Sequence, residues 1–158
     1  MVGGYGGYQD PDSLTDVELV TLDPDNFPVP PCLTNLKELP FATFGMAGAV
    51  DEDGNPFICG GARYDQPEDE IHDQCYRYDL QADSWEQHGT MPYKRVFMAD
   101  TVVPGLGLVM VGGSDGSVAT DEVIATTDGM SFQELAPLPE PSYGGRTYSE
   151  KHQHVNLQ

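Results

Sequence analysis

Short apolar runs that end in a Gly-Gly pair recur along this chain, and they restrict its fold more than any other feature. The pairs follow Val2, residues 57–59 and residues 108–111. A second marker recurs with them, an apolar residue before a proline: Leu39-Pro40, Met91-Pro92 and Leu138-Pro139. From Leu39 to Gly60 is 21 residues, and from Met91 to Gly112 is also 21. Matched intervals of this kind indicate an internal repeat of about 50 residues.

Each repeat contains four short strand signals and no helical period. In the middle repeat we expect strands at 41–50, 56–59, 70–79 and 84–88, with residues 51–55 as an Asp-Gly hairpin turn. In the next repeat the corresponding signals are at 97–103, 106–111, 122–127 and 131–135. Four consecutive strands without a helix predict an antiparallel meander, and such sheets arranged radially form a β-propeller. Gly-Gly at a strand end permits a positive φ and a close backbone approach.

The repeat resembles the kelch family, whose pattern is an apolar strand ending in Gly-Gly, then Tyr-Asp, a Trp, and an apolar-Pro pair followed by Arg. The middle repeat matches closely, because it has Gly60-Gly61, Tyr78-Asp79, Trp85 and Met91-Pro92 with Arg95. The third repeat has Gly112-Gly113 and, in place of the Trp, Phe132. The resemblance assigns structural positions to these markers: Gly60, Gly61, Tyr78, Trp85, Gly112, Gly113 and Phe132.

The resemblance implies an all-β, kelch-type β-propeller of about three four-stranded antiparallel blades, which is an incomplete propeller. Family propellers usually have five to seven blades. We expect a partial first blade at 1–40, a second at 41–92, a third at 93–145, and a polar tail or the start of a further blade at 146–158. Such a chain is expected to be a fragment of a longer propeller or to associate with itself, because open blade faces would otherwise be prone to aggregation.

The charge excludes several classes of partner. With 26 acidic and 7 basic side chains, the formal net charge is −19. A nucleic-acid-binding protein needs positive charge to displace counterions from phosphate, so we predict no nucleic-acid partner. No apolar run approaches the length of about 20 residues that spans a bilayer, so we also predict no membrane insertion.

Acidic residues concentrate in loops that a meander places on one face, together with the connections between repeats. These loops span 5–16, 61–73 and 114–121. Variable loops on a rigid scaffold are common binding sites, so we predict a basic or mixed-charge protein partner there. A solvated rim is the alternative. The predicted contact residues are Tyr8, Asp10, Arg63, Tyr64, Asp65, Glu68, Asp69, Glu70, Arg95 and Asp115. For Arg95 the resemblance also implies a structural role between blades.

Two of the three cysteines fall on neighbouring strands of one expected hairpin. Cys59 ends the second strand of the middle repeat and Cys75 lies in the third. Antiparallel pairing brings them within disulfide reach, which would favour an extracellular protein. Three buried, reduced thiols in a cytoplasmic protein, with Cys32 as the third, are the alternative. The sequence therefore leaves the compartment open.

No constellation of residues suggests catalysis, so we predict a non-catalytic protein–protein interaction module without a cofactor. The four histidines do not cluster, and no metal site is predicted. Residues 51–55 resemble the start of a calcium loop but lack its distal carboxylate, which favours the hairpin turn. The alternative function comes from the resemblance alone: some kelch-like propellers are enzymes, of the copper oxidase or sugar isomerase type. A copper site would need His and Tyr ligands converging on the propeller axis.

Overall fold

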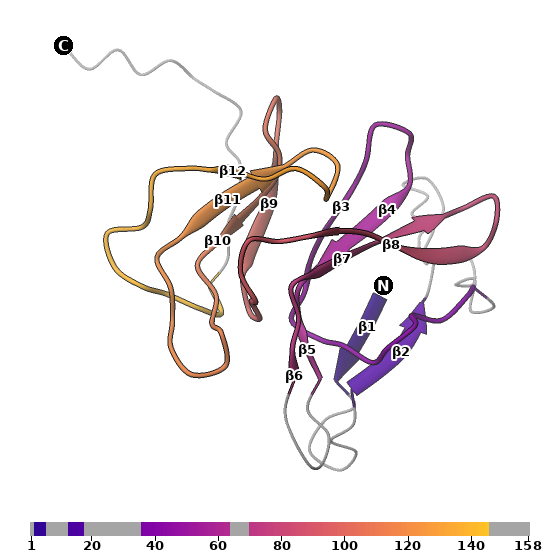
Figure 1. The fold of residues 1–158 in the computed structure, drawn as a ribbon, viewed down its shortest axis with the longest axis horizontal. Coiled ribbons are helices and arrows are strands. Elements are labelled where there is room, and N and C mark those ends of the chain that lie inside the picture. The colour runs from indigo at the N-terminus through magenta and orange to yellow at the C-terminus, as the bar shows by residue number, and fades with distance from the viewer. Residues whose placement is uncertain (1, 6–12, 18–35, 64–69, 146–158) are drawn as a thin grey trace, which may run out of the picture.

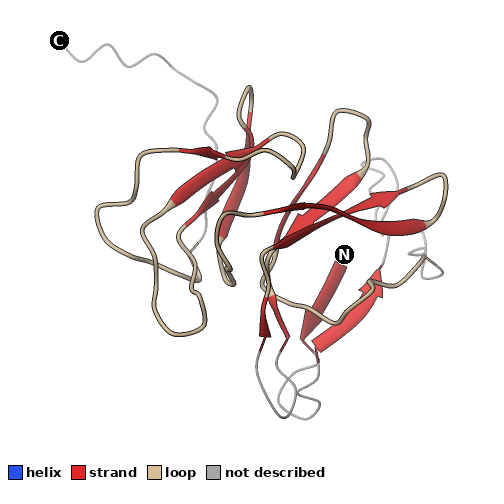
Figure 2. Cartoon of the chain, in the orientation of Figure 1, coloured by secondary structure: helices blue, strands red, loops and turns tan. Residues whose placement is uncertain are grey.

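The chain is all-β in the part that the computed structural model describes, which comprises residues 2–5, 13–17, 36–63 and 70–145. Two four-stranded antiparallel sheets dominate it, and no helix occurs in these ranges (Figure 1, Figure 2). The prediction of an all-β chain with antiparallel sheets is therefore confirmed. Two further pairs of strands, each antiparallel, accompany the large sheets.

The first large sheet, the 47–90 sheet, has the order β3-β4-β7-β8. Its strands are β3 (Ala47–Val50), β4 (Pro56–Cys59), β7 (Gln74–Asp79) and β8 (Ser84–Thr90). The predicted strand at 41–50 is shorter in the structure, because Gly45 has a φ of 66° and only an isolated bridge at Phe44 precedes β3. The predicted strand at 70–79 is split, with β6 (Glu70–Ile71) separate from β7.

The second large sheet, the 99–134 sheet, has the order β12-β11-β10-β9. It consists of β9 (Ala99–Val103), β10 (Gly107–Val111), β11 (Val123–Thr126) and β12 (Gln133–Glu134). The two small pairs are β1 (Val2–Tyr5) with β2 (Ser13–Val17), and β5 (Ala62–Arg63) with β6. The β5-β6 pair lies within the connection between β4 and β7, and the sequence patterns did not reveal it.

An apolar core joins the two large sheets. Side chains that alternate along the strands of the 47–90 sheet meet side chains of the 99–134 sheet, as the strand period of two requires. Nine buried residues form this core: Ala47, Phe57, Cys59, Cys75, Met91, Met98, Leu108, Met110 and Ile124. The opposite side of the 47–90 sheet packs Ile58 against Val17 and Leu39. The 47–90 sheet is thus covered by apolar side chains on both faces.

The repeat seen in the sequence reappears as a repeat of main-chain hydrogen bonds. The residue before each marker proline donates its N–H to the carbonyl of an earlier strand or loop. These bonds are Leu39 to Thr15, Met91 to Asp73 and Leu138 to Asp121, at 2.9, 2.7 and 2.7 Å. Four residues later the pattern recurs with Thr43 to Leu14, Arg95 to His72 and Ser142 to Thr120, at 3.2, 3.1 and 3.0 Å. Thr43, Arg95 and Ser142 therefore occupy equivalent positions.

The Gly-Gly pairs end strands where the next segment of backbone passes very close. The φ angles of Gly60, Gly61, Gly112 and Gly113 are 69°, 99°, 63° and 100°, in the left-handed region that favours glycine. The second glycine of each pair donates its N–H at 2.8 Å, from Gly61 to Arg95 and from Gly113 to Ser142. A Cβ added to Gly60 would lie 2.7 Å from the Arg95 carbonyl oxygen. A Cβ added to Gly112 would lie 2.3 Å from the Ser142 carbonyl oxygen.

Phe97 adopts a left-handed backbone conformation, and glycine occupies the equivalent positions in the neighbouring repeats. Phe97 has a φ of 58°, and the equivalent Gly45 and Gly144 have φ angles of 66° and 68°. Phe97 donates its N–H to the Gly45 carbonyl, and its carbonyl accepts from the Gly144 N–H, each at 2.9 Å. Its ring lies 5.6 Å from that of Phe44. These bonds hold Phe97 in a conformation that costs about 1–2 kcal/mol for an L-residue.

We expect the substitution Phe97→Gly to lower the free energy of unfolding by less than about 1.5 kcal/mol, because relief of strain offsets the loss of a partly buried ring. The matched control is Phe132→Gly, which removes another partly buried phenyl from a residue without a positive φ. Its loss should be about 3 kcal/mol or more. Urea denaturation measures both. Equal losses for the two variants would contradict the assignment of strain to Phe97.

Candidate functional site

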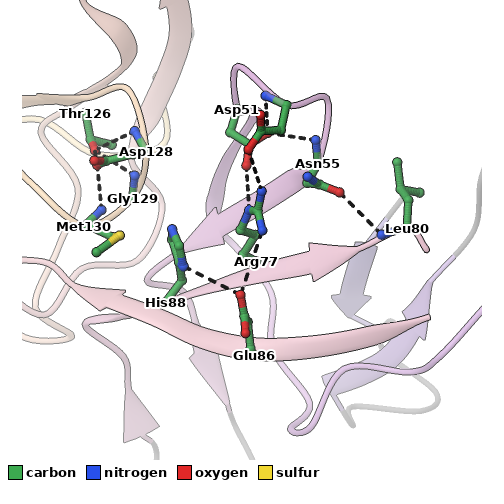
Figure 3. Close-up of polar contacts among 11 residues, drawn as sticks. Asp51, Asn55, Arg77, Leu80, Glu86, His88, Thr126, Asp128, Gly129 and Met130 are labelled. Carbon is green, nitrogen blue, oxygen red and sulfur yellow. Dashed lines mark hydrogen bonds and ion pairs between the residues drawn. The ribbon is translucent and has the colours of Figure 1, made fainter. Parts of the chain in front are cut away.

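In the described part of the chain, a hollow lies where the two large sheets meet. It has a volume of about 440 Å³ and is lined by Asp51, Glu52, Asp53, Arg77, His88, Thr127 and Asp128. We call it the inter-sheet pocket. It opens at the end of the sheets that carries the turns 51–55, 80–83, 104–106 and 127–132, which we call the hairpin face. Figure 3 shows the two walls facing each other.

One wall is the turn between β3 and β4, which Asp51 organises. Its Oδ1 accepts the N–H groups of Asp53 and Asn55, at 3.0 and 2.8 Å, and its own N–H donates to the Asn55 carbonyl at 3.0 Å. An aspartate that binds backbone N–H groups ahead of it is typical of tight turns. The residues that resembled a calcium loop thus form a hairpin turn, as the sequence favoured.

Arg77 closes the base of this wall from β7. Its Nε donates to Asp51 Oδ2 at 2.6 Å, and its other nitrogens lie 3.2 Å from Asp53 and 3.9 Å from Glu86. Burial disfavours the charge of Asp51, but the hydrogen bonds from Arg77 and the turn N–H groups outweigh it and lower the pKa of Asp51. The same bond to Asp51 raises the pKa of Arg77. Both groups are therefore charged at neutral pH.

The opposite wall is the turn between β11 and β12. Asp128 Oδ1 accepts the N–H groups of Met130 and Ser131, at 2.8 and 3.0 Å, and Thr126 Oγ1 accepts that of Gly129 at 2.8 Å. The N–H groups of Ser131 and Met130 hold the pKa of Asp128 below its usual value, although partial burial opposes them. His88 of β8 lies between the walls, with Nδ1 3.9 Å from Glu86.

The inter-sheet pocket carries a net negative charge. Four carboxylates and one guanidinium line it, so its charge is −3 when His88 is neutral. Asp53 is exposed at 82% of its side chain, and Glu52 is exposed and makes no hydrogen bond or ion pair within the described ranges. A pocket of this size and charge suits a cationic group. Such a group would meet rigid turns whose own hydrogen bonds are already made.

Most of the loop residues that the sequence nominated for partner binding lie outside the described residues: Tyr8, Asp10, Tyr64, Asp65, Glu68 and Asp69. Arg63 and Glu70 are paired across β5 and β6, at the end of the molecule opposite to the hairpin face. Asp115 begins a turn on that same end, where its Oδ1 accepts the N–H groups of Ser117 and Val118 at 2.8 and 2.9 Å. Those N–H groups lower its pKa.

Arg95 is buried, with only 8% of its surface exposed. Its guanidinium pairs with Glu122 and donates to Thr120 Oγ1 at 3.3 Å. It also lies 5.0 Å from the centre of the Tyr93 ring. Burial lowers the pKa of Arg95, and the charge of Asp115 opposes this. These contacts join the connection after β8 to the connection between β10 and β11. They correspond to the structural role that the family resemblance implied for Arg95.

The aromatic markers lie in the packing between strands and sheets. Tyr78 is 2% exposed, its hydroxyl donates to Asp83, and its ring lies 5.0 Å from that of Trp85. Burial, then the bond to Asp83, raise the pKa of Tyr78 to about 12. Trp85 donates its indole N–H to the Lys37 carbonyl at 3.0 Å, and Phe132 packs against the core between the sheets.

The predicted disulfide between Cys59 and Cys75 is present. The two residues are directly opposite each other on β4 and β7, with Cα atoms 4.1 Å apart. Gly60 donates its N–H to the Gln74 carbonyl at 3.0 Å, which makes Cys59 and Cys75 a non-hydrogen-bonded pair, the closer of the two antiparallel pairings. Both cysteines are fully buried in the core between the two large sheets.

Within the described ranges, no group of three or more His, Cys, Asp or Glu side chains is placed to hold a metal ion. Over those same residues, no helix has the length and apolar character needed to cross a membrane.

The inter-sheet pocket was not anticipated from the sequence. The only sequence signal of this pocket was the run of acidic residues at 51–53, which we interpreted as part of a hairpin turn. Asp128 is 75 positions beyond Asp53 in a different repeat. Their approach depends on how the two sheets stack, which no local pattern encodes.

Stacked four-stranded antiparallel sheets with repeated inter-sheet hydrogen bonds define a protein of the β-propeller type. No family model and no curated protein matches the chain in sequence. Among solved structures, it is similar to the propeller-type protein YjhT, with a TM-score of 0.66 and 16% identity. This match covers 90% of the chain and 49% of YjhT, so the chain spans about half the length of that protein.

A second solved structure, a fungal alcohol oxidase in complex with copper, has a TM-score of 0.41 and 13% identity, over 91% of this chain and 44% of the oxidase. A similarity this low bears on neither fold nor function. The match to YjhT supports a propeller-type fold and, at its level of identity, nothing about activity.

Proposed function

We propose that this chain is part of a kelch-type β-propeller and acts as a non-catalytic protein-interaction module with a basic partner. The observation that carries the proposal is the inter-sheet pocket, an acidic hollow between two blades whose walls are held rigid by Asp51 and Asp128. Propeller folds present turns on a rigid scaffold, and binding often uses such turns. The negative charge of the pocket selects a cationic group of the partner.

The module would therefore use the hairpin face, whereas the sequence nominated loops on the opposite face. The hairpin face combines exposed carboxylates, Glu52 and Asp53, with carboxylates already fixed by hydrogen bonds. A partner's lysine or arginine meets charge that needs no rearrangement, which lowers the cost of binding. Because exposed charges act through solvent, the attraction should weaken as salt rises above about 0.1 M.

A charge reversal in the pocket tests this function. The probe is a short peptide in which lysine alternates with serine, and its affinity is measured by calorimetry at low ionic strength. We expect binding to the wild-type chain and a loss of about fivefold in affinity for Glu52→Lys, because each exposed pairing contributes up to about 1 kcal/mol. Glu52 is an exposed turn residue, so the fold should be unaffected.

The matched control is Glu140→Lys, which makes the same change in net charge at an exposed residue on the opposite face. Its affinity for the peptide should stay close to that of the wild type. If the peptide does not bind the wild-type chain, or if both variants weaken binding equally, the pocket is not the site and the proposed function fails.

A further inference from the structure

Three Asp-Gly pairs occur in the chain, and each lies in a turn between two strands. They are Asp53-Gly54 between β3 and β4, Asp115-Gly116 between β10 and β11, and Asp128-Gly129 between β11 and β12. An aspartate followed by glycine is especially prone to rearrange to isoaspartate, because glycine has no side chain to shield its amide nitrogen. The surroundings of each pair decide which of them is free to react.

The rearrangement needs only the two residues of the pair and water. The amide nitrogen of the glycine attacks Cγ of the protonated aspartic acid, an N–Cγ bond forms, and the hydroxyl leaves with the amide proton as water. Water then opens the succinimide ring. Cleavage at Cγ restores aspartate, whereas cleavage at the backbone carbonyl carbon leaves a main chain that runs through Cβ and Cγ. A pair therefore reacts only if its carboxyl group is free to turn toward the next amide.

The carboxylates of Asp115 and Asp128 are held in their turns. Oδ1 of Asp115 accepts two backbone N–H groups at 2.8 and 2.9 Å, and Oδ1 of Asp128 accepts two at 2.8 and 3.0 Å. These bonds favour the charged form and lower the pKa of both carboxyl groups, whereas the hydroxyl leaves only from the protonated form. Both residues must break two hydrogen bonds before they react.

The glycines of these two pairs are confined as well. A Cβ added to Gly116 would lie 3.0 Å from the Ile71 side chain, and one added to Gly129 would lie 3.1 Å from the ring of the buried Phe57. Closure of the succinimide ring changes the backbone angles of the pair. Neighbouring groups this close resist that change.

The pair Asp53-Gly54 has neither restraint. Within the described ranges the Asp53 carboxylate accepts no backbone N–H, its one polar partner is Arg77 at 3.2 Å, and its side chain is 82% exposed. No atom lies within 4 Å of a Cβ added to Gly54. The N–H groups of all three glycines are hydrogen-bonded, at 3.1, 3.1 and 2.8 Å, so these bonds do not distinguish the pairs.

We propose that Asp53 is a site of spontaneous isoaspartate formation in the folded protein, whereas Asp115 and Asp128 are protected by their turns. Asp53 lines the inter-sheet pocket. The product lengthens the backbone of this wall by one carbon atom and leaves the carboxylate directly on Cα. The charge of the pocket stays the same, but one of its carboxylates moves. The modification does not depend on whether the pocket binds a partner.

Peptide mapping by mass spectrometry tests the proposal on the folded wild-type chain, incubated for weeks in slightly acidic buffer. Isoaspartyl peptides keep the mass of the parent peptides but separate from them in chromatography, and electron-transfer fragmentation locates the altered residue. We expect isoaspartate to form at Asp53 about tenfold faster than at Asp115 or Asp128, because two backbone hydrogen bonds of about 1 kcal/mol each protect those residues.

The same incubation in concentrated urea is the control for the influence of the fold. All three pairs should then react at similar rates, because the turns are lost. The variant Asp53→Glu keeps the charge but cannot form the succinimide, so its peptide should show no isoaspartate while Asp115 and Asp128 are unaffected. Equal rates at the three pairs of the folded chain, or faster reaction at Asp115 or Asp128, would overturn the proposal. Reaction of Asp53 in urea but not in the folded chain would overturn it as well.

Discussion

The substitution Gly112→Ala is expected to lower the free energy of unfolding by about 3–5 kcal/mol, a large share of the total stability of a domain. The φ of Gly112 is 63°, and an added Cβ would lie 2.3 Å from the Ser142 carbonyl oxygen. That oxygen belongs to the backbone and accepts the N–H of Gly113, so it cannot rotate away. Strain at φ and a clash with fixed backbone therefore add together. Urea denaturation followed by circular dichroism measures the loss.

The substitution Gly105→Ala separates the cost of strain at φ from the cost of the clash with the backbone. The φ of Gly105 is 84°, but no atom lies within 4 Å of an added Cβ, because the residue is at the tip of the turn between β9 and β10. This control should lose only about 1–2 kcal/mol from strain. A loss for Gly112→Ala no larger than that of the control would show that the close approach of Ser142 is not a feature of the folded protein.

Removal of the disulfide, by the double substitution Cys59→Ala with Cys75→Ala, is expected to lower the free energy of unfolding by about 3 kcal/mol. The bond joins residues 16 positions apart, and closing a loop of this length restricts the unfolded chain by about that amount. A dithiol reductant should destabilise the wild-type chain to the same extent and should not affect the double variant. The midpoint of urea denaturation, with and without reductant, measures both effects.

Cys32→Ala is the control, and it should keep the stability of the wild type and its sensitivity to the reductant. Cys32 lies outside the residues that the structure describes. Labelling of free thiols in the unfolded, non-reduced protein provides an independent count, with one thiol expected to react. Three reactive thiols would contradict the disulfide and would favour the alternative of buried, reduced cysteines.

Much of the fold could be predicted because its constraints are local and recur. Gly-Gly marks the places where the backbone needs a positive φ, and the residue before each proline marks the repeated hydrogen bond to an earlier strand. The short apolar runs before the Gly-Gly pairs at 60–61 and 112–113 identified the strands β4 and β10. The disulfide was one of two alternatives that the sequence left open, and it could be considered because Cys59 and Cys75 lie on strands that are joined by one connection.

The candidate site could not be predicted in the same way. Asp51 and Asp128 each form an ordinary turn, and nothing in either turn indicates that the other will face it. Phe97 shows the same limit, because its positive φ results from hydrogen bonds to Gly45 and Gly144 and is not a preference of phenylalanine. The loops that the sequence nominated for binding were identified by their acidic charge and by their place on one face of the predicted meander, and neither property reveals which face is hollow.

The sequence by itself determined the strand order in the two large sheets and the positions of the Gly-Gly turns, and it placed two cysteines on neighbouring strands, because each depends on residues that are close in the chain or recur with its repeat. Only the tertiary structure decided where a partner would meet a concave, charged surface. The inter-sheet pocket exists because the core of Phe57, Leu108 and Met110 sets how the two sheets stack, and that stacking brings distant acidic turns together. A repeat encodes each four-stranded sheet, whereas the contact between the sheets is a property of the packed chain.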